Sequence, residues 1–391
     1  MGDWRTTPGT VLMVTLACLL TGCTVGGPVP APTPAGTAPA AVESLENTIG
    51  RFMEDDVTSV VVQVRWEGGE WSRGYGLRDE GGDDPARPQD RFSIASVTKS
   101  MVAASVMKLV DDGLIGLDDP VNGVLESFVT VLTPPGPITV RQLLNHTSGM
   151  PEFLALYGTT GTVKELVTSG FTVQRGLELT AALPWERSSV GYFAYSNGNY
   201  LALAQLIEKL RAKPLAAVLK DDAFVPLGLD RTTFGVEDRE ASDNLRAYVL
   251  VDGERVEVTQ AEQLVGFPGG GVVSTVEDVN DFYRALLTGR LVSPGSLAEM
   301  KKAPSMDYGL GLTRWRDGCS PTGYGYGHRG SVYGYLSTSI SSDDGDRQVT
   351  IGMALPTLPA EDGDPVTGRR LDQYASQMDL VARKTLEQLC G

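Results

Sequence analysis

The chain has 391 residues, of which 41% are apolar and 7% aromatic, enough to bury one large core or two interlocked ones. It carries 33 Lys and Arg against 49 Asp and Glu, a net charge of −16. So acidic a surface repels phosphate backbones and anionic headgroups, which argues against a nucleic-acid partner and against electrostatic adsorption on a membrane.

An apolar run near the N-terminus predicts export. Val11–Leu20 is too short to span a bilayer but has the length of a signal-peptide core. It leads into Leu20-Thr21-Gly22-Cys23, which resembles a bacterial lipobox and predicts a lipoprotein signal peptide over residues 1–22 with Cys23 lipidated. The alternative is an ordinary secretory signal, since the start of the chain has few positive charges. We expect an extracytoplasmic protein anchored to the cell membrane through a lipid on Cys23.

Residues 23–41 predict a tether. Between Thr24 and Ala40 the segment is dominated by Pro, Ala, Gly and Thr and has no charged residue. Such a sequence cannot form a core, so we expect it to lift a folded domain, residues 42–391, off the membrane.

The first half of the domain predicts a hairpin followed by helices. A helix is expected over residues 42–53, and two glycines supply a turn between the β-rich Ser59–Trp66 and Trp71–Leu77. Apolar residues at helical spacing predict a helix over Ser96–Val110, and the pattern stays mainly helical to about Leu229.

Strands return in the second half. Ala247–Val258 predicts a hairpin turning at Asp252-Gly253, and Ser274-Thr275-Val276-Glu277 predicts a capping box that opens a helix through Leu287. The last expected elements are strands around Gly309–Trp315, Gly334–Ser341 and Val349–Ala354 and a helix near Leu371–Leu389. This order indicates an α/β (α+β) fold, in which one antiparallel sheet from both chain ends is flanked by helices and carries an inserted, mainly helical lobe.

The cysteines agree with export. Once the signal is removed, Cys23, Cys319 and Cys390 remain. With Cys23 acylated, the other two form an even pair in an oxidising compartment, which predicts a disulfide. About 70 residues separate them, and closing such a loop stabilises a fold by roughly 4 kcal/mol on the chain-entropy model. Two buried thiols are the alternative.

Ser96-Val97-Thr98-Lys99 is an S-x-x-K motif on a predicted helix. Positions i and i+3 share a helix face, so the serine hydroxyl and the lysine amine can meet. A hydroxyl becomes a nucleophile when a neighbour accepts its proton, and a lysine can do so if burial lowers its pKa. About one or two such motifs arise by chance in a chain of this length, and Ser105-Val106-Met107-Lys108 is a second. The motif alone therefore identifies no site.

Two further motifs favour Ser96. Tyr195-Ser196-Asn197 is the only Y-x-N in the chain, and His328-Arg329-Gly330 is the only H-x-G. Their order and spacings of roughly 100 and 130 residues resemble serine D-alanyl-D-alanine carboxypeptidases, class C β-lactamases and related esterases. Supporting strings are Phe92–Ala95, Leu144–Met150, Gly269–Gly271 before Ser274-Thr275, and Tyr308–Gly311. The resemblance covers nearly all of residues 42–391 and implies a β-lactamase/transpeptidase-like fold.

The resemblance implies a mechanism. Ser96 attacks a peptide carbonyl, Lys99 and Tyr195 relay its proton to the leaving amine, and water later releases the acyl group. Asn197 orients the substrate amide.

The last motif completes the implied site. The N–H groups of Ser96 and Ser331 hold the oxyanion, and Ser331 and Gly330 bind substrate. His328 positions and charges the back of the site. Arg329 binds substrate.

Departures from the family pattern bear on the substrate. His328 in place of Lys favours carboxypeptidases and esterases over β-lactamases, and the two late cysteines resemble those of secreted D-alanyl-D-alanine carboxypeptidases. Arg329 replaces a Thr or Ser that contacts the substrate carboxylate, and Thr313 replaces an Arg. We therefore expect Arg329 or Arg314 to bind that carboxylate, unless the substrate has changed. The alternative for Arg329 is a position in solvent or a pairing with an Asp.

Other sites are less well supported. The chain has two histidines, so little remains for zinc, and Gly269–Gly271 lacks the G-K-[ST] of a phosphate loop. No metal or cofactor is expected. His146 is interpreted as structural, and the acidic doublets as solvated surface rather than glycosidase carboxylates. Ala194–Gly198 nearly matches the G-x-S-x-G of a nucleophile elbow but lacks its first glycine.

The sequence thus predicts a serine acyl-hydrolase that acts through an acyl-enzyme, in the first place a D-alanyl-D-alanine carboxypeptidase on small peptides or peptidoglycan. Alternatives are an esterase or β-lactamase on the same scaffold, or a non-catalytic lipoprotein that binds penicillin or peptidoglycan. The intact Ser96, Lys99, Tyr195 and His328 count against a pure binder, because binding needs no proton relay.

Overall fold

The computed structural model describes residues 40–154, 156, 172–235, 242–259, 267–359 and 365–390. The predicted signal peptide, the lipidation site at Cys23 and the tether up to residue 39 lie outside them. None of the helices in the described ranges is long and apolar enough to cross a membrane.

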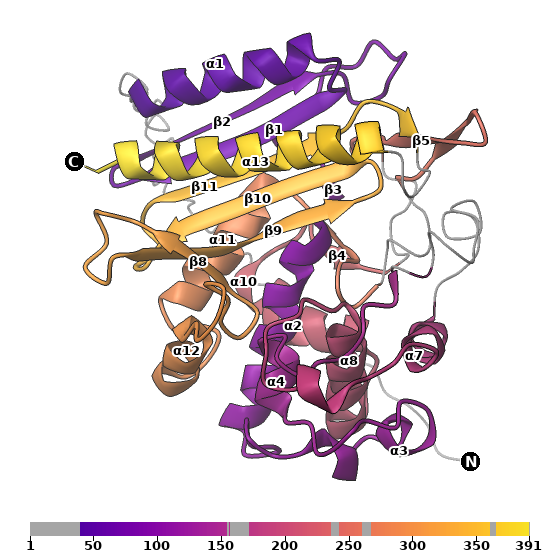
Figure 1. The fold of residues 1–391 in the computed structure, drawn as a ribbon. Helices are drawn as coiled ribbons and strands as arrows, with labels where there is room; N and C mark the ends of the chain where they lie inside the picture. The colour runs from indigo at the N-terminus through magenta and orange to yellow at the C-terminus, as the bar shows by residue number, and fades with distance from the viewer. Residues whose placement is uncertain are drawn as a thin grey trace, which may run out of the picture. The chain divides into compact units, whose positions relative to one another are not determined.

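Six antiparallel strands form the main sheet (Figure 1). In order across the sheet they are β2 (Gly69–Gly76), β1 (Ser59–Trp66), β11 (Gln348–Ala354), β10 (Tyr335–Ser342), β9 (Tyr324–Val332) and β8 (Thr313–Arg316). β1 pairs with β11 from Ser59 opposite Ala354 to Arg65 opposite Gln348. The two ends of the domain therefore meet in the middle of one sheet, which confirms the predicted arrangement.

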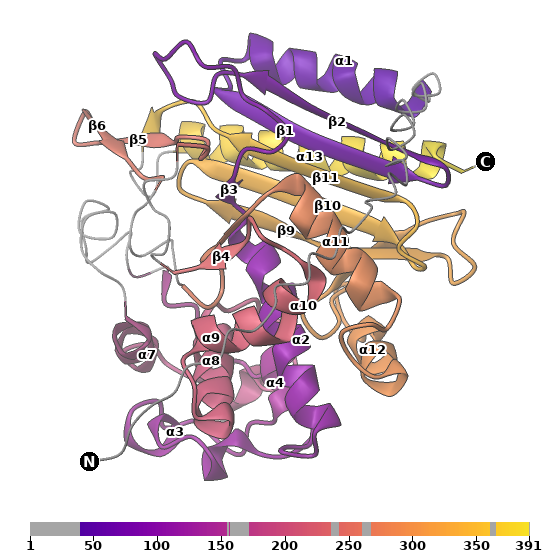
Figure 2. The same cartoon turned by 180° about the vertical axis from the view of Figure 1, so that it is seen from behind.

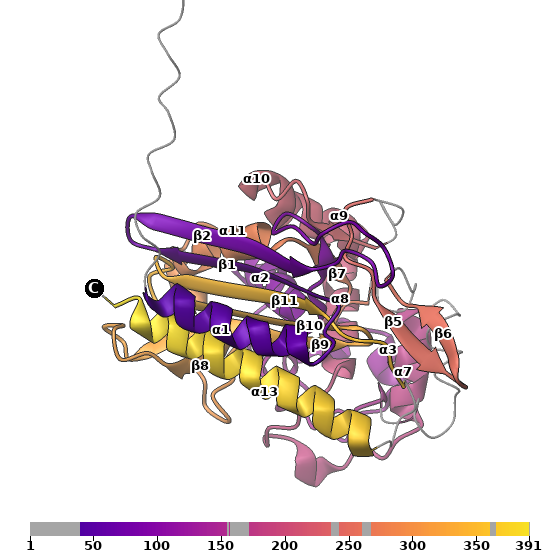
Figure 3. The same cartoon turned by 90° about the horizontal axis from the view of Figure 1, so that it is seen from above.

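Helices cover both faces of this sheet. α1 (Ala40–Glu54) and α13 (Pro365–Gln388) lie side by side on one face, and α11 (Val276–Leu287) lies on the other (Figures 2 and 3). Successive side chains of β1 point to opposite faces of the sheet, and apolar or hydrogen-bonded residues on each side explain why both faces are covered. Val60, Val62 and Val64 pack in the core under α1 and α13, whereas Gln63 accepts a hydrogen bond of 2.8 Å from Asn280 of α11.

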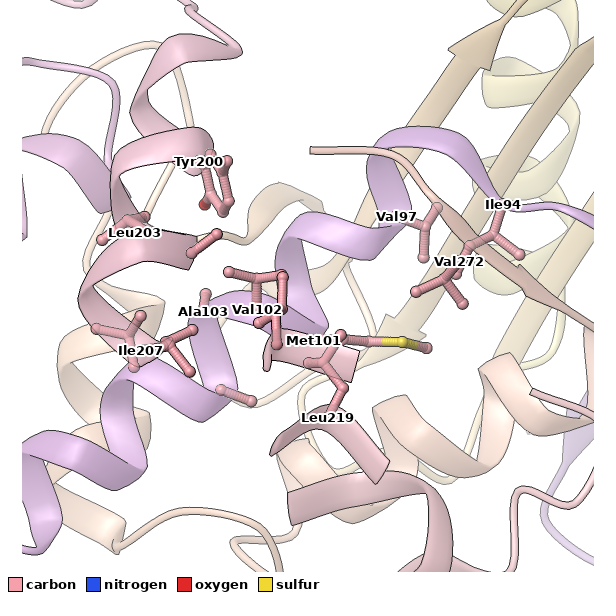
Figure 4. Close-up of a cluster of buried hydrophobic side chains, with 14 of the residues drawn as sticks. Ile94, Val97, Met101, Val102, Ala103, Tyr200, Leu203, Ile207, Leu219 and Val272 are labelled. Carbon is pink, nitrogen blue, oxygen red and sulfur yellow. The ribbon is translucent and has the colours of Figure 1, made fainter. Parts of the chain in front are cut away.

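The helical lobe is built around α2 (Thr98–Asp111), as predicted. Its other members are α3 (Ser127–Thr130), α4 (Val140–Leu144), α7 (Val173–Ala181), α8 (Gly198–Arg211), α9 (Leu215–Leu219), α10 (Val225–Leu227) and α12 (Pro294–Lys301). Met101 and Val102 of α2 are completely buried and face side chains of α8 and α9, such as Leu203 and Leu219 (Figure 4). A helix buried on nearly all sides is held rigidly, and α2 begins two residues after Ser96.

Two small sheets complete the fold. They are β3 (Phe92–Ser93), β7 (Val272–Ser274) and β4 (Thr233–Phe234) in one, and β12 (Leu358–Pro359), β5 (Tyr248–Val251) and β6 (Glu254–Glu257) in the other. The predicted turn between β5 and β6 is confirmed, because Asp252 and Gly253 have φ angles of 53° and 80°, as a tight two-residue hairpin requires.

Several element boundaries differ from the predictions. Thr275, not Ser274, caps α11, since the Thr275 side chain accepts a hydrogen bond of 3.1 Å from the Asp278 N–H. Ser274 belongs to β7 and bonds Thr232 through its hydroxyl. The C-terminal helix begins at Pro365, six residues before the predicted Leu371.

The predicted disulfide between Cys319 and Cys390 is confirmed. It joins the loop between β8 and β9 to the second residue after α13, over a sequence separation of 71. The strand that carries His328 is thereby linked covalently to the last helix of the domain.

Candidate active site

Ser96 lies in a 3-10 turn, Ala95–Val97, between β3 and the start of α2. Ala95 has a φ of 47°, a left-handed conformation that is costly for a residue with a side chain and is found where surrounding structure enforces it. Gly330 of β9 packs against this turn. A Cβ at Gly330 would lie 2.9 Å from the Ala95 Cβ and still closer to the Ile94 carbonyl, so glycine allows the close approach of β9.

Lys99 is completely buried beside Ser96. Its Nζ lies 3.0 Å from the Ser96 Oγ, 2.8 Å from the Asn197 Oδ1 and 2.6 Å from the Gly269 carbonyl oxygen. The first S-x-x-K is thus joined to the Y-x-N segment and to the triple glycine. The lysine of the second S-x-x-K motif is placed differently, because Lys108 pairs with Asp222 at 3.8 Å.

The hydrogen bonds of Lys99 suit a base. A neutral amine has two N–H donors and one lone pair. When the donors are taken by Asn197 and Gly269, the lone pair faces the Ser96 hydroxyl. Burial lowers the pKa of Lys99 to about 7, while the negative charge of Glu152 opposes that change. A large neutral fraction near pH 7 follows.

Tyr195 lies over the same amine, with its ring centroid 5.0 Å from the Lys99 Nζ. Although 37% of the residue is exposed, burial of its phenol raises the pKa of Tyr195 above its ordinary value, and a hydrogen bond with Ser96 acts in the opposite direction. The hydroxyl is therefore protonated at neutral pH. It can hand a proton on, whereas Lys99 is the group able to accept one first.

His146 is the structural residue that the sequence predicts. Its Nδ1 accepts hydrogen bonds from the Ser196 N–H at 3.2 Å and from the Asn199 side chain at 3.0 Å, and its ring stacks on Tyr195 with centroids 4.2 Å apart. Burial and the Lys99 charge hold the pKa of His146 well below its ordinary value, so it packs as a neutral ring.

His328 lies at the back of the site, but the expectation that it carries a charge there is wrong. Burial is the main cause that lowers the pKa of His328 to about 3, with a smaller effect of Lys99. The Nδ1 donates to the Arg329 carbonyl oxygen at 2.5 Å, which leaves the Nε2 to accept from the Tyr308 hydroxyl at 2.9 Å. His328 is thus a neutral ring that makes two hydrogen bonds.

The expected substrate contact of Arg329 is also contradicted. Residues alternate along β9, so Arg329 points away from His328 to the face covered by α13. Its Nε lies 2.8 Å from the buried Asp379 of α13. Arg314 has a partner as well, Asp307 at 2.9 Å. Each of these arginines is therefore held by a carboxylate of the protein.

The remaining predicted residues lie close to the nucleophile. Asn197 is 8% exposed and directs its Oδ1 to Lys99. The sequence predicts a contact of Asn197 with the substrate amide, and this hydrogen bond to Lys99 is a role that was not expected. Ser331 follows Gly330 on β9 and is exposed. Its N–H in the oxyanion hole stays a prediction.

Glu152 and Tyr308 belong to the site but are not among the residues predicted from the sequence. Glu152 bonds both nitrogens of Asn197, and Tyr308 packs its ring between those of His146 and His328, with centroids 5.0 and 5.5 Å away. The available signal was their position, since Glu152 lies two residues after the Leu144–Met150 string and Tyr308 begins another string.

The pKa of Lys99 makes the pH dependence testable. We expect kcat/KM on a neutral ester to rise with pH through about 7 and then level, because protonated Lys99 cannot accept the Ser96 proton. Neither His328, with a pKa of about 3, nor Tyr195, whose pKa is raised, titrates in that range. A rate profile flat from pH 5 to 9 would exclude Lys99 as the base.

Comparison with known proteins agrees with this geometry. A family model described as Beta-lactamase matches residues 45–378. The chain is 27% identical over 274 residues to penicillin-binding protein 4* of Bacillus subtilis (strain 168), covering 63% of this chain and 57% of that protein. It is 30% identical over 166 residues to Esterase EstB of Burkholderia gladioli, covering 41% of this chain and 42% of that protein.

A solved structure gives the same result. The D-stereospecific amidohydrolase from Streptomyces sp. matches with a TM-score of 0.69 and 26% identity, covering 85% of this chain and 98% of that one. The chain spans 57% and 42% of the length of these two curated relatives, which is less than two thirds of each. Because the family model matches most of the domain and the fold agrees, this chain belongs to the beta-lactamase family of serine hydrolases.

Proposed function

We propose that the protein cleaves an amide or ester bond of a small peptide-like substrate through an acyl-enzyme on Ser96. The observation that carries the proposal is the buried Lys99 amine, whose two fixed acceptors turn its lone pair toward the Ser96 hydroxyl. A protein that binds its ligand without a covalent step needs no such base, and burying an amine costs free energy unless the amine is paired or neutral.

The reaction runs in two halves. Ser96 attacks the substrate carbonyl as its proton passes to Lys99, and the N–H groups of Ser96 and Ser331 stabilise the oxyanion. Tyr195 then gives its phenolic proton to the leaving amine or alcohol and recovers one from Lys99. In the second half a water molecule attacks the acyl carbon as its proton passes to Lys99. The bond to Ser96 then breaks, and the relay returns that proton to the Ser96 oxygen, which releases the acid and free Ser96.

The substrate is the finer question. A D-alanyl-D-alanine carboxypeptidase, the activity that the sequence resemblance implies, acts on peptides with a terminal carboxylate. A second candidate, an amidase or esterase, is favoured because Arg329 and Arg314 both bind carboxylates of the protein. The Streptomyces amidohydrolase and the Burkholderia esterase are family members consistent with it. We therefore propose that a free terminal carboxylate is not required.

The nucleophile can be identified directly. We expect Ser96→Ala to abolish both ester hydrolysis and covalent labelling by a β-lactam, because the acyl group has no other acceptor. Ser105→Ala is the matched control, since it changes the serine of the second S-x-x-K on the same helix and should keep the labelling. Mass spectrometry that places the acyl group on another serine would contradict the proposal.

Substrate preference can be tested with paired peptides. Short D-alanyl peptides with free or amidated C-termini should be cleaved with similar kcat/KM, and Arg329→Ala should change their ratio less than about threefold. A charge-assisted contact of about 2 kcal/mol would instead cost about thirtyfold on the free acid alone. Such a selective loss would restore Arg329 as a carboxylate ligand and favour the carboxypeptidase. Arg314→Ala gives the same comparison for the other arginine.

The membrane anchor is a separate proposal and rests on sequence. Leu20 to Cys23 and the uncharged tether support lipidation of Cys23 outside the cytoplasm. We expect the protein to partition into detergent and Cys23→Ser to release it into the soluble fraction. Wild-type protein recovered in the soluble fraction with an unmodified Cys23 would leave simple secretion as the explanation.

A further inference from the structure

Glu152 is joined to the active site through Asn197. One carboxylate oxygen, Oε2, lies 2.7 Å from the Asn197 backbone N–H and 3.0 Å from its side-chain Nδ2. The other, Oε1, accepts from the Leu154 N–H at 2.9 Å. Both carboxylate oxygens of Glu152 thus accept hydrogen bonds, and both nitrogens of Asn197 donate to it.

These hydrogen bonds determine the orientation of the Asn197 side-chain amide. An amide has a donor end and an acceptor end, and the carboxylate of Glu152 can only accept. The Nδ2 must therefore face Glu152, so the Oδ1 faces the Lys99 Nζ at 2.8 Å. With the amide reversed, two N–H donors would confront the amine and Lys99 would lose one of the acceptors that aim its lone pair at Ser96.

Glu152 also acts on Lys99 by its charge. The titratable groups around the Lys99 amine in the described structure are Glu152, His146, His328, Tyr195 and Tyr200. The two histidines are held neutral and the two tyrosines protonated, so the carboxylate supplies the negative charge there. It opposes the effect of burial, which favours the neutral amine.

We propose that Glu152 is a positioning residue for Lys99, whose carboxylate fixes the Asn197 amide and whose charge sets how readily Lys99 gives up a proton. The inference rests on the proposed function, in which Lys99 is the base. It assigns a reason for an acidic residue at this place, since a neutral residue could hold Asn197 but could not counter the loss of solvent around the amine.

The test is the pH profile of ester hydrolysis by Glu152→Gln. Glutamine keeps an acceptor oxygen but removes the charge, so the Lys99 ammonium is less favoured. The acidic limb of the profile, where kcat/KM falls because Lys99 is protonated, should move to lower pH by about one unit. Glu178→Gln is the control, because it removes the same charge at an exposed position on α7, where the carboxylate bonds Gln174, and should leave the limb in place.

Glu152→Asp separates charge from geometry. It keeps the charge on a shorter side chain, so the limb should stay near its wild-type position while kcat falls as Asn197 loses its fixed partner. An unchanged limb in Glu152→Gln, with or without a uniform loss of rate, would overturn the proposal. If Glu152→Gln does not fold, a limb that moves down in Glu152→Asp would overturn it instead.

These outcomes are distinct from a failure of the proposed function. If the wild-type protein hydrolyses the ester and Ser96→Ala does not, the function stands whatever Glu152→Gln shows. If Ser96→Ala keeps full activity, the proposed function fails and the profile of Glu152→Gln has no bearing on Ser96.

Discussion

The structure depends on one buried amine. Removing an ammonium group from water is costly unless it is paired or gives up its proton, and Lys99 is completely buried. Its hydrogen-bond partners come from three places in the chain, namely Ser96, Asn197 and Gly269. Each must arrive with the right atom facing the amine, so the lobe and the sheet have to be assembled around it before the site exists.

Close packing at two glycines keeps that assembly tight. At Gly269 a Cβ would lie 3.0 Å from the Asn197 Oδ1 and 3.1 Å from the Lys99 Nζ, so a side chain there would compete with the amine's hydrogen bonds. At Gly330 a Cβ would collide with the turn that carries Ser96. Both glycines serve close approach, because neither has a positive φ.

Much of the fold could be predicted from local pattern. The β1 and β2 hairpin, the Asp252-Gly253 turn and the helix after Ser96 each follow from periodicity or turn chemistry within a few residues. β9 was harder, because Tyr324–Val332 contains three glycines and a single β-branched residue. Its pairing with β10 provides the stability that its own sequence lacks.

The residues of the active site also divide into those that local sequence predicted and those that depend on the folded structure. Motif order identified Ser96, Lys99 and Tyr195, since their roles depend on residue type. Arg329 could not be placed, because alternation along a strand shows that two neighbours face opposite ways without showing which face meets the substrate. The answer depends on Asp379, fifty residues later on α13. The charge of His328 depended likewise on burial, which no local pattern reveals.

The pairing of β1 with β11 has a consequence for how the chain folds. β1 is among the first elements to be synthesised, yet its second neighbour lies almost 300 residues later. Contacts of such long range must await nearly the whole chain and pay a large loop-closure entropy, which slows folding. Until then β1 and β2 are a lone hairpin, which is marginally stable in water. The main sheet therefore cannot be completed until its last strands have been made.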